Sequence, residues 1–189
     1  SQDKPRLLFC AHIDAKLNTP GALDNAAGVA TLLLLAELLT THKEGLAVEL
    51  LAMNGEDYYA ASGELAYLAD EASRLEAITL AVNIDGAGYI NGQNVYSFYG
   101  CPDELAHSVQ TVLSAKHGLP EGPSWFQSDH MVFAQKGVPA VALTTNEFAE
   151  FQGQIAHSPA DTPEVVDGGQ LVHLARALAD LAATLARSP

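Results

Sequence analysis

The segment RLLFCAHID, residues 6–14, decides the fold class, because an apolar run of strand length ends in a histidine and an aspartate. Two later segments repeat this arrangement: VELLAMNGED, residues 48–57, ends in two carboxylates, and LAVNID, residues 80–85, ends in one. Parallel strands of an open α/β sheet end at a shared edge, and ligands bind in the crevice beyond it. These side chains are therefore expected to meet at one edge, and they have the nitrogen and oxygen ligands that zinc accepts.

Strands alternate with helices along the rest of the chain. Apolar spacing and turn residues predict these elements: strand 7–11, a helix starting at Asp24 or Asn25, strand 48–53, helix 63–75, strands 80–84 and 95–99, helices 103–116 and 129–135, strand 139–145, and a last helix capped by Asp167. Residues 145–162 show no periodicity, and a loop of this length usually has a function. The alternation predicts an α/β fold with a mostly parallel, mixed sheet and helices on both faces.

The composition excludes several classes of partner. The chain has 189 residues, 48% hydrophobic and 17% charged, which is ordinary for one globular domain. A net charge of −14 with nine basic residues argues against nucleic acid and anionic membranes as partners. No apolar run approaches the ~20 residues of a membrane span, and no signal segment precedes the first strand. We expect a soluble protein, cytoplasmic rather than secreted, whose oligomeric state the sequence does not predict.

His12 and Asp14 are the first candidate site residues. Residues two apart in an extended segment point to the same side, so Asp14 could reach the His12 ring, fix its tautomer and raise its basicity. An incidental pair in a loop would have the same spacing. Asp24, in GALDNAAG, is also open to two interpretations. Capping of a helix would account for it, but its two carboxylate oxygens could also bridge two metals.

The adjacent carboxylates Glu56 and Asp57 form the most suggestive local feature. Two adjacent carboxylates repel each other, which is unfavourable unless a cation lies near them or the two have different roles. We expect Glu56 to take a proton from the attacking water and Asp57 to hold a metal; a solvated acidic turn is the alternative. Asp85 ends an apolar strand before Gly86. A metal would satisfy it if it is buried, although an aspartate before glycine also starts many turns.

His157 lies in the long aperiodic loop, where Pro159 and local hydrogen bonds could fix its geometry. His130 follows Ser128 and Asp129, which could form a helix cap or a pocket wall. We expect Asp129 and His130 to contact the substrate. The other histidines fall on or beside predicted helices and are expected outside the site: His42, His107, His117 and His173.

Six motifs in register resemble the co-catalytic di-zinc aminopeptidase family of metallopeptidases, family 28, which also includes glutamate carboxypeptidases and glutaminyl cyclases. They are, in the family's order and with similar spacing, AHID, PGALDNAAG, NGED, NIDG, SDHMVFAQKGVPAV and IAHSPADT. The resemblance covers nearly the whole chain. It implies a zinc-exopeptidase-like three-layer sandwich, and a single catalytic domain over residues 1–189 that lacks the family's usual N-terminal portion.

The resemblance also implies two zinc ions and a division of roles. One ion would be held by His12 and Asp85 and the other by Asp57 and His157, with Asp24 as the bridge and Glu56 as the general base. Two departures stand out. The second carboxylate is usually Glu, and Asp57 is one methylene shorter. Some family aminopeptidases have an oxyanion-stabilising tyrosine before the last histidine, where this chain has Ala156; the candidates to replace it are Tyr58, Tyr59 and His130.

The implied activity is release of N-terminal residues from peptides. Apolar P1 residues are expected, because Trp125, Phe126, Phe148 and Phe151 lie in loops that could line a pocket. A carboxypeptidase would need a cation for the terminal carboxylate, and Lys16 falls in a predicted site loop. N-deacylation and glutaminyl cyclisation would use nearly the same ligands, and the family's cyclases bind a single zinc. A non-enzymatic binding domain is the remaining class.

Overall fold

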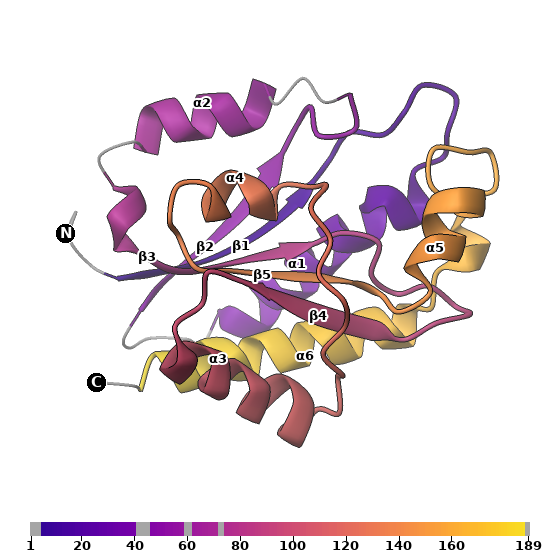
Figure 1. Cartoon of the computed structure of the whole chain (residues 1–189). Helices are drawn as coiled ribbons and strands as arrows, with labels where there is room; N and C mark the ends of the chain where they lie inside the picture. Colours follow the sequence, from indigo (N-terminus) through magenta and orange to yellow (C-terminus); the bar gives the residue numbers. More distant parts are fainter. Residues whose placement is uncertain (1–4, 41–45, 59–61, 72–73, 188–189) are drawn as a thin grey trace.

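The computed structural model describes residues 5–40, 46–58, 62–71 and 74–187, and its centre is one five-stranded sheet (Figure 1). The strands are β1 Arg6–His12, β2 Ala47–Met53, β3 Ile78–Ile84, β4 Asn94–Tyr99 and β5 Ala140–Thr145. They lie in the order β2-β1-β3-β5-β4. All neighbours are parallel except β4, which pairs antiparallel with β5 at one edge. The predicted mostly parallel, mixed sheet is confirmed.

Helices cover both faces of the sheet. They are α1 Ala27–Leu39, α2 Ser62–Glu71, α3 Asp103–Gln110, α4 His130–Ala134, α5 Phe148–Glu150 and α6 Gly168–Leu185. In Figure 1, α2 and α4 lie on one side of the sheet, and α1, α3 and α6 on the other. The arrangement is the three-layer sandwich that the resemblance implied. The predicted cap of α6 is present, since Asp167 accepts hydrogen bonds from the main chain of Gly169 and Gln170.

β1 shows why the sheet is buried on both faces. Leu7, Phe9 and Ala11 pack into the core beneath α1 and α6, whereas Leu8 and Cys10 pack into the core on the opposite face. Successive side chains of a strand point to opposite faces, so a fully apolar run fits a strand with helices on both sides. His12 is the first polar residue of this series, and it is buried where β1 ends.

Three segments differ from the sequence-based predictions. Regular helix begins at Ala27 rather than at Asp24, because Asp24 and Asn25 have non-helical dihedral angles within the irregular turn Ala22–Ala26. The helix predicted over 63–75 is α2 up to residue 71, and Leu75–Ala77 forms a separate 3-10 turn. The aperiodic stretch 145–162 contains α5 and a helical turn, Phe151–Ile155. Short helices of this kind are too brief to produce a periodic pattern.

One stretch of the described residues, Ala22–Leu39, is long and apolar enough by composition alone to cross a membrane. The stretch is 18 residues long, which is close to the length of a membrane span, whereas the sequence analysis predicted no apolar run of that length. Half of the stretch is buried in the fold, where α1 packs against α6, and the core helix of a soluble domain meets the same criteria.

Candidate metal centre

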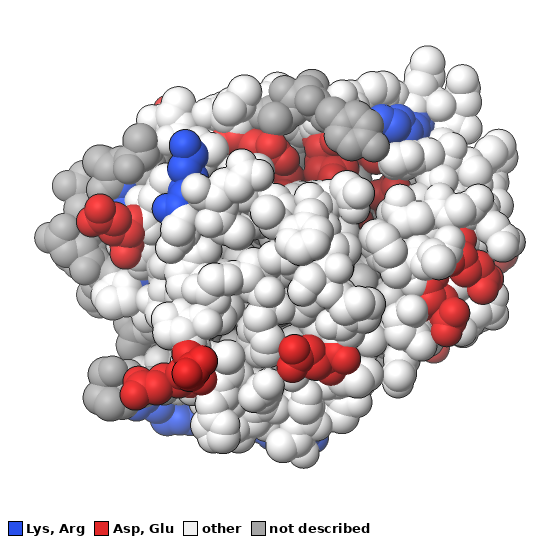
Figure 2. Space-filling view, in the orientation of Figure 1, with Lys and Arg blue, Asp and Glu red and all other residues white. Residues whose placement is uncertain are grey.

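The candidate site lies at the carboxyl ends of the three parallel strands β1, β2 and β3. His12 ends β1, the pair Glu56 and Asp57 lies in the turn after β2, and Asp85 follows β3 directly. Acidic side chains are visible in a hollow along the upper edge of the face shown in Figure 2. The convergence of the strand ends, predicted from three sequence segments, is present in the structure.

Asp24 lies between the two histidines of the site. Its Oδ1 is 3.1 Å from Nε2 of His12, and its Oδ2 is 3.3 Å from Nε2 of His157. The carboxylate is buried and its two oxygens face two different imidazoles. This is the placement that a bridging carboxylate needs.

Each histidine has a further carboxylate beside it. Nε2 of His12 lies 3.6 Å from Oδ1 of Asp85, and Nε2 of His157 lies 2.7 Å from Oδ1 of Asp57. His157 has a positive φ of 59°, an uncommon backbone conformation for a residue other than glycine. The structure therefore brings together all five residues for which a metal-binding role was expected.

The geometry of these groups fits zinc. Nitrogen and oxygen ligands about 2.0–2.2 Å from a tetrahedral ion lie roughly 3.4 Å from one another, close to the separations at His12 and Asp24. Nε2 of His12 and Oδ2 of Asp57 are buried and have no hydrogen-bond partner among the described residues. Buried polar atoms without partners are costly unless a ligand satisfies them. Zinc would supply a partner to both.

The electrostatics of the site also favour cations. Burial lowers the pKa of His12, but the carboxylates of Asp24 and Asp85 outweigh burial and raise it to about 12. Burial and the neighbouring Asp85 carboxylate raise the pKa of Glu56 to about 8. The raised pKa of His12 reports the negative charge around it, and the raised pKa of Glu56 reports burial first and the neighbouring carboxylates second. Divalent cations bound here would offset that negative charge and favour the ionised form of Glu56.

Asp14 supports the site in a way that differs from the expected one. The main-chain oxygen of Asp14, rather than its carboxylate, lies 3.1 Å from Nδ1 of His12, while the carboxylate oxygen is 3.8 Å away. The carboxylate instead accepts hydrogen bonds from the main-chain N–H groups of Gly55, at 2.8 Å, and Asp57, at 3.2 Å. Asp14 thus orients the His12 ring through its backbone and the turn after β2 through its side chain.

Asp129 and His130 lie behind the site. Both are fully buried, neither lines the cavity at the strand ends, and Nε2 of His130 lies 3.0 Å from the main-chain oxygen of Trp125. Burial and the neighbouring Glu64 carboxyl raise the pKa of Asp129 to about 9. The expected direct contact with substrate does not fit this placement, because both side chains are covered by the wall of the cavity.

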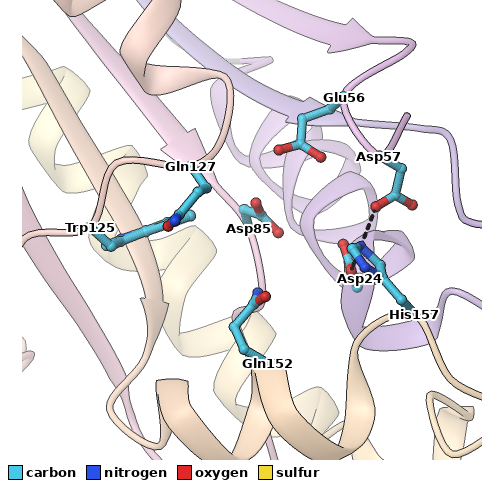
Figure 3. A pocket seen from close by; sticks show the side chains of 8 residues that line it. All are labelled: Asp24, Glu56, Asp57, Asp85, Trp125, Gln127, Gln152 and His157. Carbon is cyan, nitrogen blue, oxygen red and sulfur yellow. Dashed lines mark hydrogen bonds and ion pairs between the residues drawn. The ribbon is translucent and has the colours of Figure 1, made fainter. Parts of the chain in front are cut away.

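The sequence analysis did not single out two amide side chains that line the site, Gln127 and Gln152. They line the cavity together with Asp24, Glu56, Asp57, Asp85, Trp125 and His157. Figure 3 shows the ends of Gln127 and Gln152 on the side of Asp85, across the cavity from Asp57 and His157. Gln152 comes from the helical turn Phe151–Ile155, within the long stretch for which a function was expected.

A second cavity of about 280 Å³ adjoins the metal centre and shares Trp125 and Gln127 with it. Phe126 and Phe148 also line this cavity, and none of the described residues in its wall is charged. Three of the four aromatic residues expected to form a pocket are therefore in its wall. Phe151 is not; it is 1% exposed and packs in a core cluster with Leu23.

The remaining polar candidates lie at the rim of the site. The hydroxyl of Tyr58 accepts a hydrogen bond from the main chain of Leu17, and Lys16 lies over the Tyr58 ring, with Nζ 4.6 Å from the ring centroid. Neither Lys16 nor Tyr58 lines the cavity. Tyr59, the other tyrosine considered for the oxyanion, is outside the described residues.

Comparison with known proteins identifies the family. The model of peptidase family M28 matches residues 1–182, so this chain belongs to peptidase family M28. The family resemblance of the six sequence motifs is thereby confirmed. The uncharacterized protein YfbL of Escherichia coli (strain K12) is 26% identical over 200 residues, which cover 86% of this chain and 61% of that protein.

Solved structures share the fold. The LapA aminopeptidase of Legionella pneumophila has a TM-score of 0.82 at 16% identity, covering 100% of this chain and 53% of its own. BSAP, a zinc aminopeptidase from Bacillus subtilis, has a TM-score of 0.82 at 18% identity, covering 99% and 47%. Glutaminyl cyclase of Macrostomum lignano has a TM-score of 0.76 at 19% identity, covering 97% and 68%. The chain spans about half the length of these two aminopeptidases.

Proposed function

We propose that this chain is the catalytic domain of a zinc-dependent aminopeptidase that hydrolyses the N-terminal peptide bond of its substrate. One observation carries the proposal: the two carboxylate oxygens of Asp24 face His12 and His157 separately. A carboxylate in this position could bind two ions at once. Asp85 would be a further ligand of the ion at His12, and Asp57 of the ion at His157. Four carboxylates converge here, counting Glu56, and two dications would balance their charge.

Each group of residues around the cavity would have its own role in the hydrolysis. Bound zinc would supply Lewis acidity, which lowers the pKa of water and polarises a carbonyl. Glu56 lines the cavity, with Oε2 3.9 Å from Nε2 of His12, so it can take the proton of the attacking water and pass it to the leaving amine. Gln127 and Gln152 offer neutral N–H donors on the side of Asp85, where they would contact the main chain of the substrate.

The side chains that line the two cavities favour a free α-amine over a free carboxylate. Among the residues that the structure describes, no Lys or Arg lines either cavity, and Lys16 lies over the Tyr58 ring. With zinc bound, the charge of the carboxylates would be offset, and a terminal carboxylate would still lack the cationic side chain that usually binds it. A free α-amine could bind a zinc ion or a carboxylate of the site.

The neighbouring cavity suits an apolar side chain at P1. Its wall contains Trp125, Phe126 and Phe148, its volume is about 280 Å³, and it opens beside the metal centre through Trp125 and Gln127. Burial of a leucyl or phenylalanyl side chain there would contribute about 1.5–3 kcal/mol to binding. A charged P1 residue would have no partner in the wall.

A panel of substrates tests the proposal on protein with measured zinc content. Leucine anilide should be cleaved faster than aspartate or lysine anilide, and N-acetyl-leucine anilide should be cleaved slowly or not at all. Faster cleavage of the acetylated substrate would point to a deacylase, and faster cleavage of an acyl-dipeptide to a carboxypeptidase. Cyclisation of an N-terminal glutaminyl peptide by protein that holds one zinc ion would point to a glutaminyl cyclase.

A further inference from the structure

Asp161 is a buried carboxylate next to the metal centre that has no place in the chemistry above. It is fully buried and four residues beyond His157. Its Oδ1 accepts a hydrogen bond from the main-chain N–H of Leu23 at 2.6 Å, and its Oδ2 accepts one from that of Asp24 at 3.1 Å. The main-chain oxygen of Asp161 accepts a third, from Ala22, at 3.2 Å. Three consecutive N–H groups thus point to one residue.

These N–H groups precede α1, where the helix itself cannot satisfy them. The first N–H groups of a helix have no intrahelical acceptor and need another partner when they are buried. Asp24 also has non-helical dihedral angles, φ −119° and ψ 81°, and the residue at the N-cap position, Gly21, has no side chain to accept these hydrogen bonds. The contacts of Asp161 therefore determine where the main chain of Asp24 lies, and with it the direction of the Asp24 carboxylate.

Asp161 also belongs to the turn that carries His157. The N–H of Ser158 bonds the oxygen of Ile155, and the N–H of Asp161 bonds the oxygen of Ser158, so that residues 155–161 form one compact turn. Asp24 and His157 face each other at 3.3 Å from the two segments that Asp161 joins. A displacement of Asp161 would change the separation of these two groups.

We propose that Asp161 is a positioning residue that fixes Asp24 against the turn of His157 and thereby sets the zinc affinity of the site. This inference rests on the proposed two-zinc function, in which the Asp24 carboxylate would be shared by both ions. Carboxylates and carbonyls that orient metal ligands typically alter metal affinity by about 10–100-fold when they are removed.

The test is zinc binding to the folded, metal-free protein, measured by competition with a chromophoric chelator and without any assay of activity. Asp161→Ala should lower the affinity for the more weakly bound zinc ion by about tenfold or more. Asp161→Asn keeps the shape and one acceptor oxygen but turns an NH₂ group toward a main-chain N–H, so it should give a smaller loss. If the alanine variant does not fold by circular dichroism, the asparagine variant decides the question in the same way.

Asp167→Ala is the matched control. Asp167 also accepts two main-chain hydrogen bonds, from Gly169 at 2.7 Å and Gln170 at 3.4 Å, but it caps α6 and contacts no residue of the metal centre. It should lower the urea midpoint without changing zinc affinity. Wild-type affinity in the Asp161 variants, or an equal loss in the Asp167 variant, would overturn the inference. A parent protein that binds fewer than two zinc ions would instead refute the proposed function.

Discussion

The carboxylate of Asp14 accepts a hydrogen bond from the main-chain N–H of Asp57, with 3.2 Å between Oδ2 and N. A residue two positions beyond the end of β1 thus holds the turn that follows β2, although Asp14 and Asp57 are 43 positions apart. Because Glu56 lies in the same turn, this contact and the one to Gly55 position the proposed general base as well as a proposed metal ligand.

Asp14→Ala should therefore impair the site without removing a ligand. We expect a loss of about 10–100-fold in kcat/KM, because the turn that carries Glu56 and Asp57 loses two hydrogen bonds. Steady-state kinetics at saturating zinc would measure the change. Asp103→Ala, an exposed substitution in the first turn of α3, is the control and should leave kcat/KM unaltered. A fully active Asp14→Ala enzyme would show that the turn keeps its place without these bonds.

Glu56→Gln should separate the base from the ligands. The variant should hold as much zinc as the parent and bind substrate, yet lose about 10²–10⁴-fold in kcat, since the amide cannot accept the proton of the attacking water. Elemental analysis and steady-state kinetics measure the two quantities. Glu164→Gln, at an exposed position that does not line the cavity, serves as the control. Nearly full activity of Glu56→Gln would mean that another group acts as the base.

Removal of metal should abolish activity and leave the fold intact. The sheet and its two cores do not depend on the metal centre, so chelation should change the far-UV circular dichroism little, and added zinc should restore activity. Asp24→Asn should bind at least one zinc ion fewer than the parent. Loss of the helical signal on chelation would show that the metals have a structural role instead.

Gln152→Ala tests whether the amide contacts substrate. Loss of one hydrogen bond to the substrate should lower kcat/KM by about tenfold at unchanged zinc content. Gln154→Ala is a matched control, because Gln154 is an exposed glutamine of the same helical turn that does not line the cavity. If the two variants have equal kcat/KM, Gln152 makes no productive contact.

Asp129 should make the folded protein less stable as the pH becomes alkaline. Burial and the Glu64 carboxyl raise its pKa to about 9 in the fold, above the ordinary value of 3.8, so the folded state favours the protonated acid. The stability that comes from this group is fully present below its ordinary pKa and is lost as the pH rises through about 9. Urea midpoints of the metal-free protein from pH 6 to 10 should fall less for Asp129→Asn than for the parent. Parallel curves would contradict the prediction.

The sheet and the convergence of the proposed ligands could be predicted from the sequence for a common reason. An apolar run that ends in His12 or Asp85 predicts both a buried strand and a polar side chain at its end. Parallel pairing of the strands then brings these ends together. The target of the Asp14 carboxylate could not be predicted, because it depends on how β1 aligns with β2. A period-two pattern shows only the side to which Asp14 points.

The residues that would contact substrate were harder to predict. Gln127 and Gln152 are exposed amides, which are common on any protein surface, so neither composition nor spacing marks them. Asp129 and His130 are residue types that are common in active sites. At the start of α4, however, both are buried behind the cavity wall that contains Trp125. Which polar residue is covered depends on tertiary packing, which a local pattern does not contain.

The contact between Asp57 and His157 spans 100 positions of the chain. During synthesis, a ribosome-bound chain that has not yet released residues 157 and 161 has neither the second histidine nor the carboxylate that holds Asp24. Such an intermediate can fold β1, β2 and β3, but it cannot assemble both halves of the metal centre. All five strands precede residue 157, so the two halves of the proposed metal centre can come together only after the whole sheet has been synthesised.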